Sequence, residues 1–135
     1  MTDHFSDINV GEALVQDFVL SLKAYGSISK GDLVYLSNHT TGEIGAVSSA
    51  TGTQVPVGQA LKSASAGDYV PILVRGVAKV TASGSITLGT KVKSVAPGGS
   101  YVAASTAYAV TNCGIALQTL SNGDTGLIIL TCGGN

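Results

Sequence analysis

The amino-acid sequence predicts an all-β protein, a single compact domain of the sandwich or barrel type that is built from two repeated hairpin units. Three observations lead to this prediction. Short runs that alternate between apolar and polar residues, bounded by turn residues, occupy most of the chain. No window keeps the apolar spacing of a helix with capping residues at its ends. Finally, two segments of the chain repeat each other closely.

The first strand is expected at residues 18–23, where Phe18, Leu20 and Leu22 alternate with their neighbours. Pro71 lacks a backbone donor, so we expect the run around it to be an edge strand or a bulge. Further strands are predicted at residues 33–36, 43–47, 59–63, 69–74, 77–81, 85–88, 91–95 and 101–104, and a last hairpin at residues 113–132.

The repeat relates residues 58–74 to residues 114–130 without gaps, with seven identical residues in seventeen aligned positions. Upstream, residues 30–34 echo residues 88–92. We therefore predict an N-terminal arm and a β domain that contains two half-domains packed about a pseudo-twofold axis. The alternative is convergence on the same hairpin chemistry. The expected boundaries are 1–17 for the arm, 18–135 for the β domain, and about 28–81 and 86–135 for the pseudo-repeats.

Glycine followed by aspartate recurs where strands should reverse. A glycine permits the positive φ of such a turn, and the next aspartate can accept a local backbone N–H. We interpret these pairs as structural turns rather than as a ligand site. They are Gly31 and Asp32, Gly67 and Asp68, and Gly123 and Asp124.

Charged residues make up only 11% of the chain, whereas 44% of it is hydrophobic. Soluble domains usually carry about 25% charged residues. Such a chain either presents hydroxyls and small residues to water or covers much of its surface in an assembly. Its apolar content excludes a disordered tract.

Charge is unevenly distributed. Four acidic residues, Asp3, Asp7, Glu12 and Asp17, precede the first basic residue, Lys23. Between residues 62 and 93 the balance reverses. This pattern fits either solvated surface or an acidic arm that docks on the basic face of a neighbour. The acidic start is unlike a signal peptide and no run is long enough for a membrane span, so we expect synthesis in a host cytoplasm and no membrane contact.

The residues needed for catalysis are sparse. The two histidines, His4 and His39, have no nucleophile with an orienting carboxylate beside them, so we predict no enzyme and no catalytic residue. Neither a metal site nor a cofactor motif is expected. Lys91 and Lys93 would share a strand face near Tyr101, which we interpret as solvated surface rather than a nucleic-acid site.

Cys113 and Cys132 would lie directly opposite each other if Asn122-Gly123 formed a two-residue turn. The separation there would permit a disulfide. A cytoplasmic chain is usually reduced, so we favour two thiols packed side by side.

Three motifs carry a family resemblance: residues 31–34, the hairpin at residues 58–68 and the run at residues 72–77. The hairpin motif returns at residues 114–124. Together they resemble a family of small tailed-phage head proteins, the capsid decoration or cement proteins, some of which carry a recombinase-like label. The resemblance covers roughly residues 28 to 132.

The resemblance implies a β-barrel-like or β-tulip domain that binds the major capsid protein on the outer surface of an icosahedral head, as a homotrimer, and stabilises the lattice. The acidic arm departs from the family pattern. We hypothesise that it adds a strand to a neighbouring subunit or to the capsid, the alternative being a frayed terminus. Its apolar anchors would be Phe5, Ile8, Val10 and Leu14.

A second hypothesis is a carbohydrate- or receptor-binding β module of a tail or cell surface. Such a module needs a cluster of exposed aromatic residues, but the sequence has no Trp, two Phe and five Tyr residues. The virion structural protein is therefore the leading hypothesis.

Overall fold

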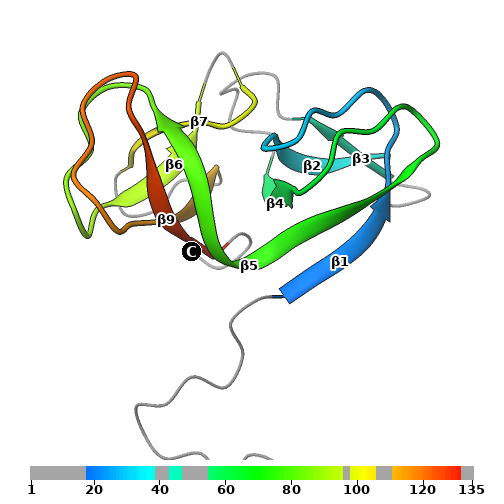
Figure 1. The fold of residues 1–135 in the computed structure, drawn as a ribbon, viewed down its shortest axis with the longest axis horizontal. Helices are drawn as coiled ribbons and strands as arrows, with labels where there is room; N and C mark the ends of the chain where they lie inside the picture. Colours follow the sequence, from blue (N-terminus) through cyan, green and yellow to red (C-terminus); the bar gives the residue numbers. More distant parts are fainter. Residues whose placement is uncertain (1–17, 39–42, 47–54, 96–97, 106–110, 132–135) are drawn as a thin grey trace, which may run out of the picture.

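The computed structural model describes residues 18–38, 43–46, 55–95, 98–105 and 111–131. Within these ranges the chain forms β-strands and no helix, which confirms the all-β prediction. Figure 1 shows two lobes joined by one long strand. The strands are β1 (Phe18–Lys23), β2 (Leu33–Asn38), β3 (Glu43–Ala46), β4 (Pro56–Ala60), β5 (Tyr69–Ala82), β6 (Lys91–Ser94), β7 (Tyr101–Ala104), β8 (Asn112–Ala116) and β9 (Thr125–Thr131).

The C-terminal lobe is a closed five-stranded barrel, as expected from the sequence. Strand β5 pairs with β7 and β9, β7 with β6, β6 with β8, and β8 with β9. Only the β5–β7 pair is parallel. Closure leaves each of these strands paired on both sides, which removes the exposed edges that favour aggregation.

The N-terminal lobe repeats this arrangement without closing. Its ladder runs β1, β5, β4, β2, β3. In this order β1 takes the place that the C-terminal part of β5 has in the closed barrel. The N-terminal part of β5 takes the place that β9 has there. In the described strands, β1 and β3 contact each other but form no ladder equivalent to β5–β7. The two lobes are therefore a closed barrel and an open version of it.

Strand β5 belongs to both lobes and bends between them (Figure 1). The sequence pattern predicted two strands here, at residues 69–74 and 77–81, and an edge strand or bulge at Pro71. Both predictions are wrong. Pro71 lies opposite Ser21 in regular register, and its carbonyl accepts the Leu61 N–H at 3.0 Å. A contact that uses only the carbonyl does not need the donor that proline lacks.

Two further differences concern the C-terminal lobe. The strand predicted at residues 85–88 is an isolated bridge between Ile86 and Leu120 followed by a turn. Gly114 lies opposite Leu130, one residue away from the register that a two-residue turn at Asn122-Gly123 predicts, and Cys132 lies outside the described residues. The register prediction is wrong because Asn122 and Gly123 do not link two strands directly. A type I′ turn needs two residues with positive φ, and only Gly123 has one, at 87°.

Each lobe has its own apolar core. The N-terminal core gathers Ile28, Val34, Val70 and Ile72. Inward residues of β5 and β9 alternate with outward ones in the C-terminal lobe, as a half-buried sheet requires. That core is made of Leu33, Leu73, Ala78, Val80, Ala82, Ile86, Val92, Val102, Cys113, Ala116, Leu120, Ile128 and Leu130.

The N-terminal lobe contributes Leu33 and Leu73 to the core of the other lobe. The amide of Gln59 also connects the lobes, because its Nε2 donates to the carbonyls of Gly31 at 3.1 Å and Lys79 at 2.7 Å. The Leu33 N–H donates to the Gly99 carbonyl at 3.0 Å. The lobes are therefore held together by apolar packing and by hydrogen bonds as well as by β5.

Candidate functional site

The predicted arm anchors Phe5, Ile8, Val10 and Leu14 lie outside the described residues, as do both histidines and Cys132. Cys113 is a buried thiol whose Sγ lies 3.8 Å from the Val92 carbonyl oxygen. No group of three or more potential metal ligands occurs among the residues that the structure describes. Over the same residues, no helix has the length and apolar character needed to cross a membrane.

The predicted turn residues occupy three equivalent turns. In each, the aspartate Oδ2 accepts the backbone N–H of the serine three residues earlier, at 2.9 Å for Asp32 and at 3.0 Å for Asp68 and Asp124. The intervening glycines have φ between 87° and 94°. These carboxylates are engaged by the backbone of their own turns, which fits a structural role.

A fourth turn of the same kind, at Thr87–Thr90, has threonine where the others have aspartate. The Thr90 N–H donates to the Thr87 carbonyl at 3.0 Å, and Gly89 has a φ of 84°. The turns interlock in pairs through the bridges Ile28–Ala64 and Ile86–Leu120.

The repeat predicted from the sequence is only part of this fourfold pattern. Each copy reads Ala, two residues, Ser or Thr, one residue, Ser or Thr, one residue, Gly, then Asp or Thr. Each alanine is at most 1% exposed, and its carbonyl accepts the N–H of a turn glycine. A search for this nine-residue pattern would have found all four copies, at residues 24–32, 60–68, 82–90 and 116–124.

An exposed apolar surface lies on the outer side of β5 and β9 in the C-terminal barrel. Val77, Leu117, Leu127 and Ile129, which we call the apolar face, are 37% to 53% exposed. Val77 lies opposite Ile129 in the β5–β9 ladder, and the Leu117 N–H donates to the Leu127 carbonyl. These side chains are therefore neighbours, and a contiguous exposed apolar surface is typical of an interaction site.

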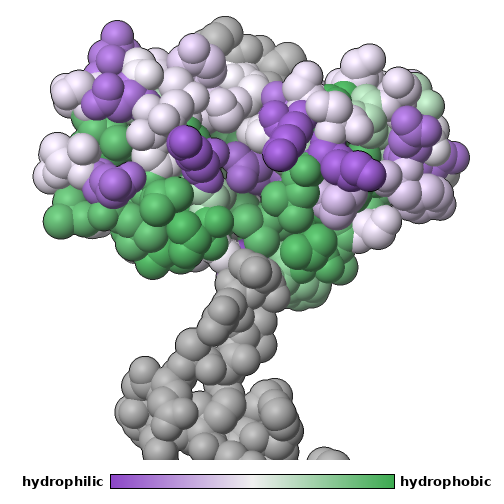
Figure 2. Space-filling view, in the orientation of Figure 1, coloured by the Kyte–Doolittle hydropathy of each residue, from purple (hydrophilic) through white to green (hydrophobic). Residues whose placement is uncertain are grey.

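The apolar face lies next to the start of β1. Phe18, Val19 and Leu20 of this strand are also exposed, by 41% to 49%. Phe18 of β1 and Thr131 of β9 both lie opposite Arg75, so the two strands meet there. Figure 2 shows the hydrophobic surface along the lower part of both lobes and more hydrophilic surface above it. The face seen in this view is therefore amphipathic.

This face was not predicted from the sequence. Residues 127–130 are a continuous apolar run, Leu-Ile-Ile-Leu, and such a run usually indicates a strand buried on both sides. Here Ile128 and Leu130 are buried, whereas Leu127 and Ile129 are exposed. A strand in the wall of a barrel has one side that faces solvent. The lack of alternating polar residues at 127–130 was therefore a signal that apolar side chains lie on that side.

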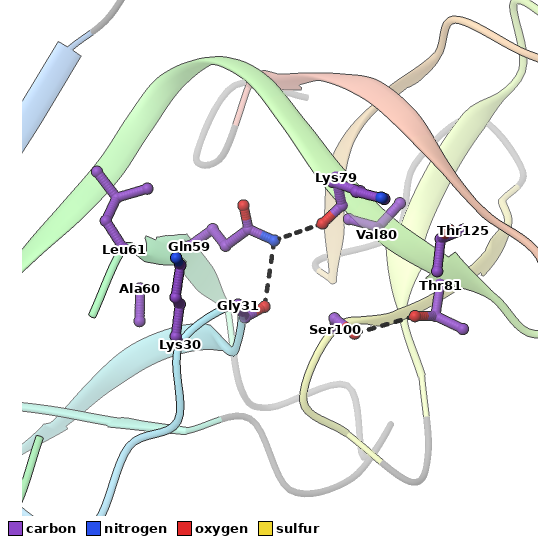
Figure 3. A pocket seen from close by; sticks show the side chains of 10 residues that line it. All are labelled: Lys30, Gly31, Gln59, Ala60, Leu61, Lys79, Val80, Thr81, Ser100 and Thr125. Atoms are coloured by element: carbon purple, nitrogen blue, oxygen red, sulfur yellow. Dashed lines mark hydrogen bonds between the residues drawn. The ribbon is translucent and has the colours of Figure 1, made fainter. Parts of the chain in front are cut away.

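A second feature is an open cleft of about 370 Å³ between the lobes. Lys30, Gln59 and Leu61 line it from the N-terminal lobe, and Lys79 and Ser100 line it from the other. Figure 3 shows the Gln59 side chain, held by its two hydrogen bonds, between Lys30 and the backbone of Lys79, whose side chain is directed away from Gln59. Two lysines and no acidic residue line this cleft.

Comparison with known proteins connects this fold to phage heads. No curated protein matches the chain. A solved structure of the N base of the head fiber gp8.5 of bacteriophage phi29 is similar, with a TM-score of 0.60 and 17% identity over 85% of this chain and 94% of that one. At this identity the likeness concerns the fold. The family model for the phage cement protein matches residues 13–132. The chain thus belongs to the phage cement protein family, whose role is capsid decoration.

Proposed function

We propose that this cement protein binds the outer surface of the assembled phage head through its apolar face. The exposure of Val77, Leu117, Leu127 and Ile129 on a rigid barrel wall supports the proposal. Burying such side chains contributes roughly 25 cal/mol per Å² of apolar surface. The partner is the major capsid protein, and the copies are proposed to stand as homotrimers at repeated lattice positions.

The proposed action is stoichiometric adhesion without a chemical step. A modest contact per copy is sufficient, because a trimer that engages several capsid subunits at once gains avidity from effective concentration. The low content of charged residues, 11%, suits this use. Few long charged side chains then have to be immobilised at the interface, which limits the entropy lost on binding.

Co-sedimentation with empty heads tests the proposal. Ile129→Lys places a charge in the middle of the apolar face, and we expect it to weaken binding by at least about tenfold, equivalent to about 1.4 kcal/mol. Leu88→Lys is the matched control, because Leu88 is 60% exposed and lies in the fourth turn, outside the face. Unchanged binding of Ile129→Lys, with normal folding, would contradict docking through this face.

Two other measurements check the proposed trimer and the proposed location on the outer surface of the head. Sedimentation equilibrium tests the trimer, and a monomer at all concentrations would exclude it. Accessibility of a bound copy to protease on intact heads tests the outer location. Binding in a glycan array by a chain that fails to sediment with heads would instead favour the carbohydrate-binding module.

A further inference from the structure

The charges of this chain are segregated between two segments. All seven basic residues and four of the eight acidic residues lie in residues 18–135, a formal charge of +3. The other four acidic residues, Asp3, Asp7, Glu12 and Asp17, give residues 1–17 a charge of −4. Together these make the net charge of −1. The two segments are thus electrostatically complementary.

Most acidic side chains of the β domain are engaged by its own turns. Asp32, Asp68 and Asp124 each accept a backbone N–H from a serine. The cleft between the lobes, in contrast, presents Lys30 and Lys79, both exposed, with no acidic residue in its lining. Leu61, which is 36% exposed, adds apolar surface to it. The cleft therefore suits a segment that carries both carboxylates and apolar side chains.

The geometry of β1 excludes a simple continuation of the arm along its own sheet. Phe18 and Thr131 both lie opposite Arg75, so β9 occupies the edge of β5 beyond the start of β1. β1 is antiparallel to β5, and Figure 1 shows its beginning directed past the bend of β5, away from the space between the lobes. Entry into the cleft of the same copy would require a reversal immediately before Phe18.

We propose that the cleft between the lobes binds residues 1–17 of a second copy of this chain. The acidic side chains face Lys30 and Lys79, and apolar arm residues contact the exposed side chain of Leu61. Seventeen extended residues span at most about 60 Å, enough to reach a neighbour. The cleft volume, about 370 Å³, is at the low end of ligand pockets, so it accepts a few arm side chains rather than the whole arm.

The contact between arm and cleft joins two copies of this chain, whereas the apolar face is proposed to join each copy to the capsid shell. This link rests on the proposed function only for the presence of neighbouring copies on a head, and an experiment can contradict either contact without contradicting the other. Each decorating molecule would give an arm to one neighbour and receive an arm from another. Such a heterologous contact continues from copy to copy until it closes into a ring.

Isotope-coded crosslinking identifies the occupant. Phe5 is replaced by p-benzoylphenylalanine in the full chain, and equal amounts of light and 15N-labelled protein are mixed, bound to heads and irradiated. We expect products of mixed isotope composition that join the arm to peptides containing residues 59–61 or 79–81. Products of a single isotope composition would show that the arm folds onto its own copy, and either this result or crosslinks only to the capsid protein would overturn the proposal.

Charge exchange tests the chemistry of the contact. Lys30→Glu with Lys79→Glu should reduce the mixed-isotope product at least tenfold, whereas Lys93→Glu, a lysine on β6 outside the cleft, should leave it unchanged. Replacing Asp3, Asp7, Glu12 and Asp17 by lysine should restore the product in the double variant. Failure of this restoration, with all variants folded, would contradict an electrostatic arm site.

Sedimentation with heads distinguishes this inference from the proposed function. The Lys30→Glu variant should still bind heads at low occupancy but lose cooperative filling of the lattice. Lys79 is left unchanged in this comparison because it lies opposite Leu127 of the apolar face. Ile129→Lys should lose binding to heads, yet still form the mixed-isotope product at high protein concentration in solution. A loss of head binding in the cleft variant equal to that of Ile129→Lys would contradict two separate contacts.

Discussion

At the scale of single residues, the four related turns rely on two kinds of side chain. The turn glycines have φ between 84° and 94°, a region that other residues rarely adopt. Three turns add a carboxylate that accepts a backbone N–H, and the fourth has Thr90 at that position. This difference within one molecule allows the contribution of the aspartate to be measured.

Asp124→Ala should lower the free energy of unfolding by about 1 kcal/mol, because the Ser121 N–H loses its acceptor. Thr90→Asp introduces a carboxylate into the fourth turn and should raise stability by a few tenths of a kcal/mol up to about 1 kcal/mol. Urea denaturation measures both changes. Equal stability of all three proteins would show that the carboxylates contribute nothing.

Two other glycines are required because a neighbouring strand passes too close to leave room for a side chain, and not because of their backbone conformation. A Cβ on Gly114 would meet the Ile129 carbonyl oxygen, and one on Gly58 would meet the Leu73 carbonyl oxygen. Gly114→Ala should therefore cost about 1–3 kcal/mol of stability through overpacking. Gly26→Ala is the control, since no atom lies within 4 Å of its added Cβ. Thermal unfolding of the two variants compares them, and a tolerated Gly114→Ala would contradict the close approach.

At the scale of elements, β5 determines how the lobes behave. Its fourteen residues pair with β1 and β4 in one lobe and with β7 and β9 in the other. Leu33 and Leu73 bury themselves in the core of the opposite lobe. Neither lobe can lose its strands without exposing part of the other, so we expect the lobes to unfold as one cooperative unit.

Ile72→Ala in the N-terminal core and Ile128→Ala in the C-terminal core test this coupling. Both side chains are fully buried, so each variant should lose about 2–5 kcal/mol. Calorimetry should give a single transition with equal calorimetric and van't Hoff enthalpies in both variants. Two resolved transitions in either variant would contradict coupling through β5.

The sequence predicted the strands that are defined locally and missed the pairings that are not. The alternation of residues 18–23 and the turn residues that bound residues 101–104 are local signals, and these segments form β1 and β7. The prediction for Pro71 is wrong because local propensity disfavours proline inside a paired strand, whereas here the neighbouring chain uses only the Pro71 carbonyl. The register predicted for the last hairpin is wrong because Leu120 pairs with Ile86, which is far away in sequence, and not with a residue of the same hairpin. The cleft joins residues from both lobes, so no local pattern could indicate it.

At the scale of the whole molecule, the cores and both candidate contact surfaces lie within residues 18–131. Deleting residues 2–12 should therefore leave the unfolding transition within about 0.5 kcal/mol of the full chain, while removing Phe5, Ile8 and Val10 from the proposed link. Denaturant titration checks the first outcome and the mixed-isotope experiment, with the photoreactive residue in the cleft, checks the second. Undiminished copy-to-copy crosslinking would show that the arm plays no part.

The meeting of β1 and β9 at Arg75 has a practical consequence for engineering. A peptide fused to either end of the domain would emerge beside the apolar face, against the shell to which we propose it binds. A circular permutant, with a short linker from Thr131 to Phe18 and new ends opened between Ser83 and Gly84, would move the attachment point to the far end of β5. Antigens or enzymes fused there should remain accessible on a decorated head.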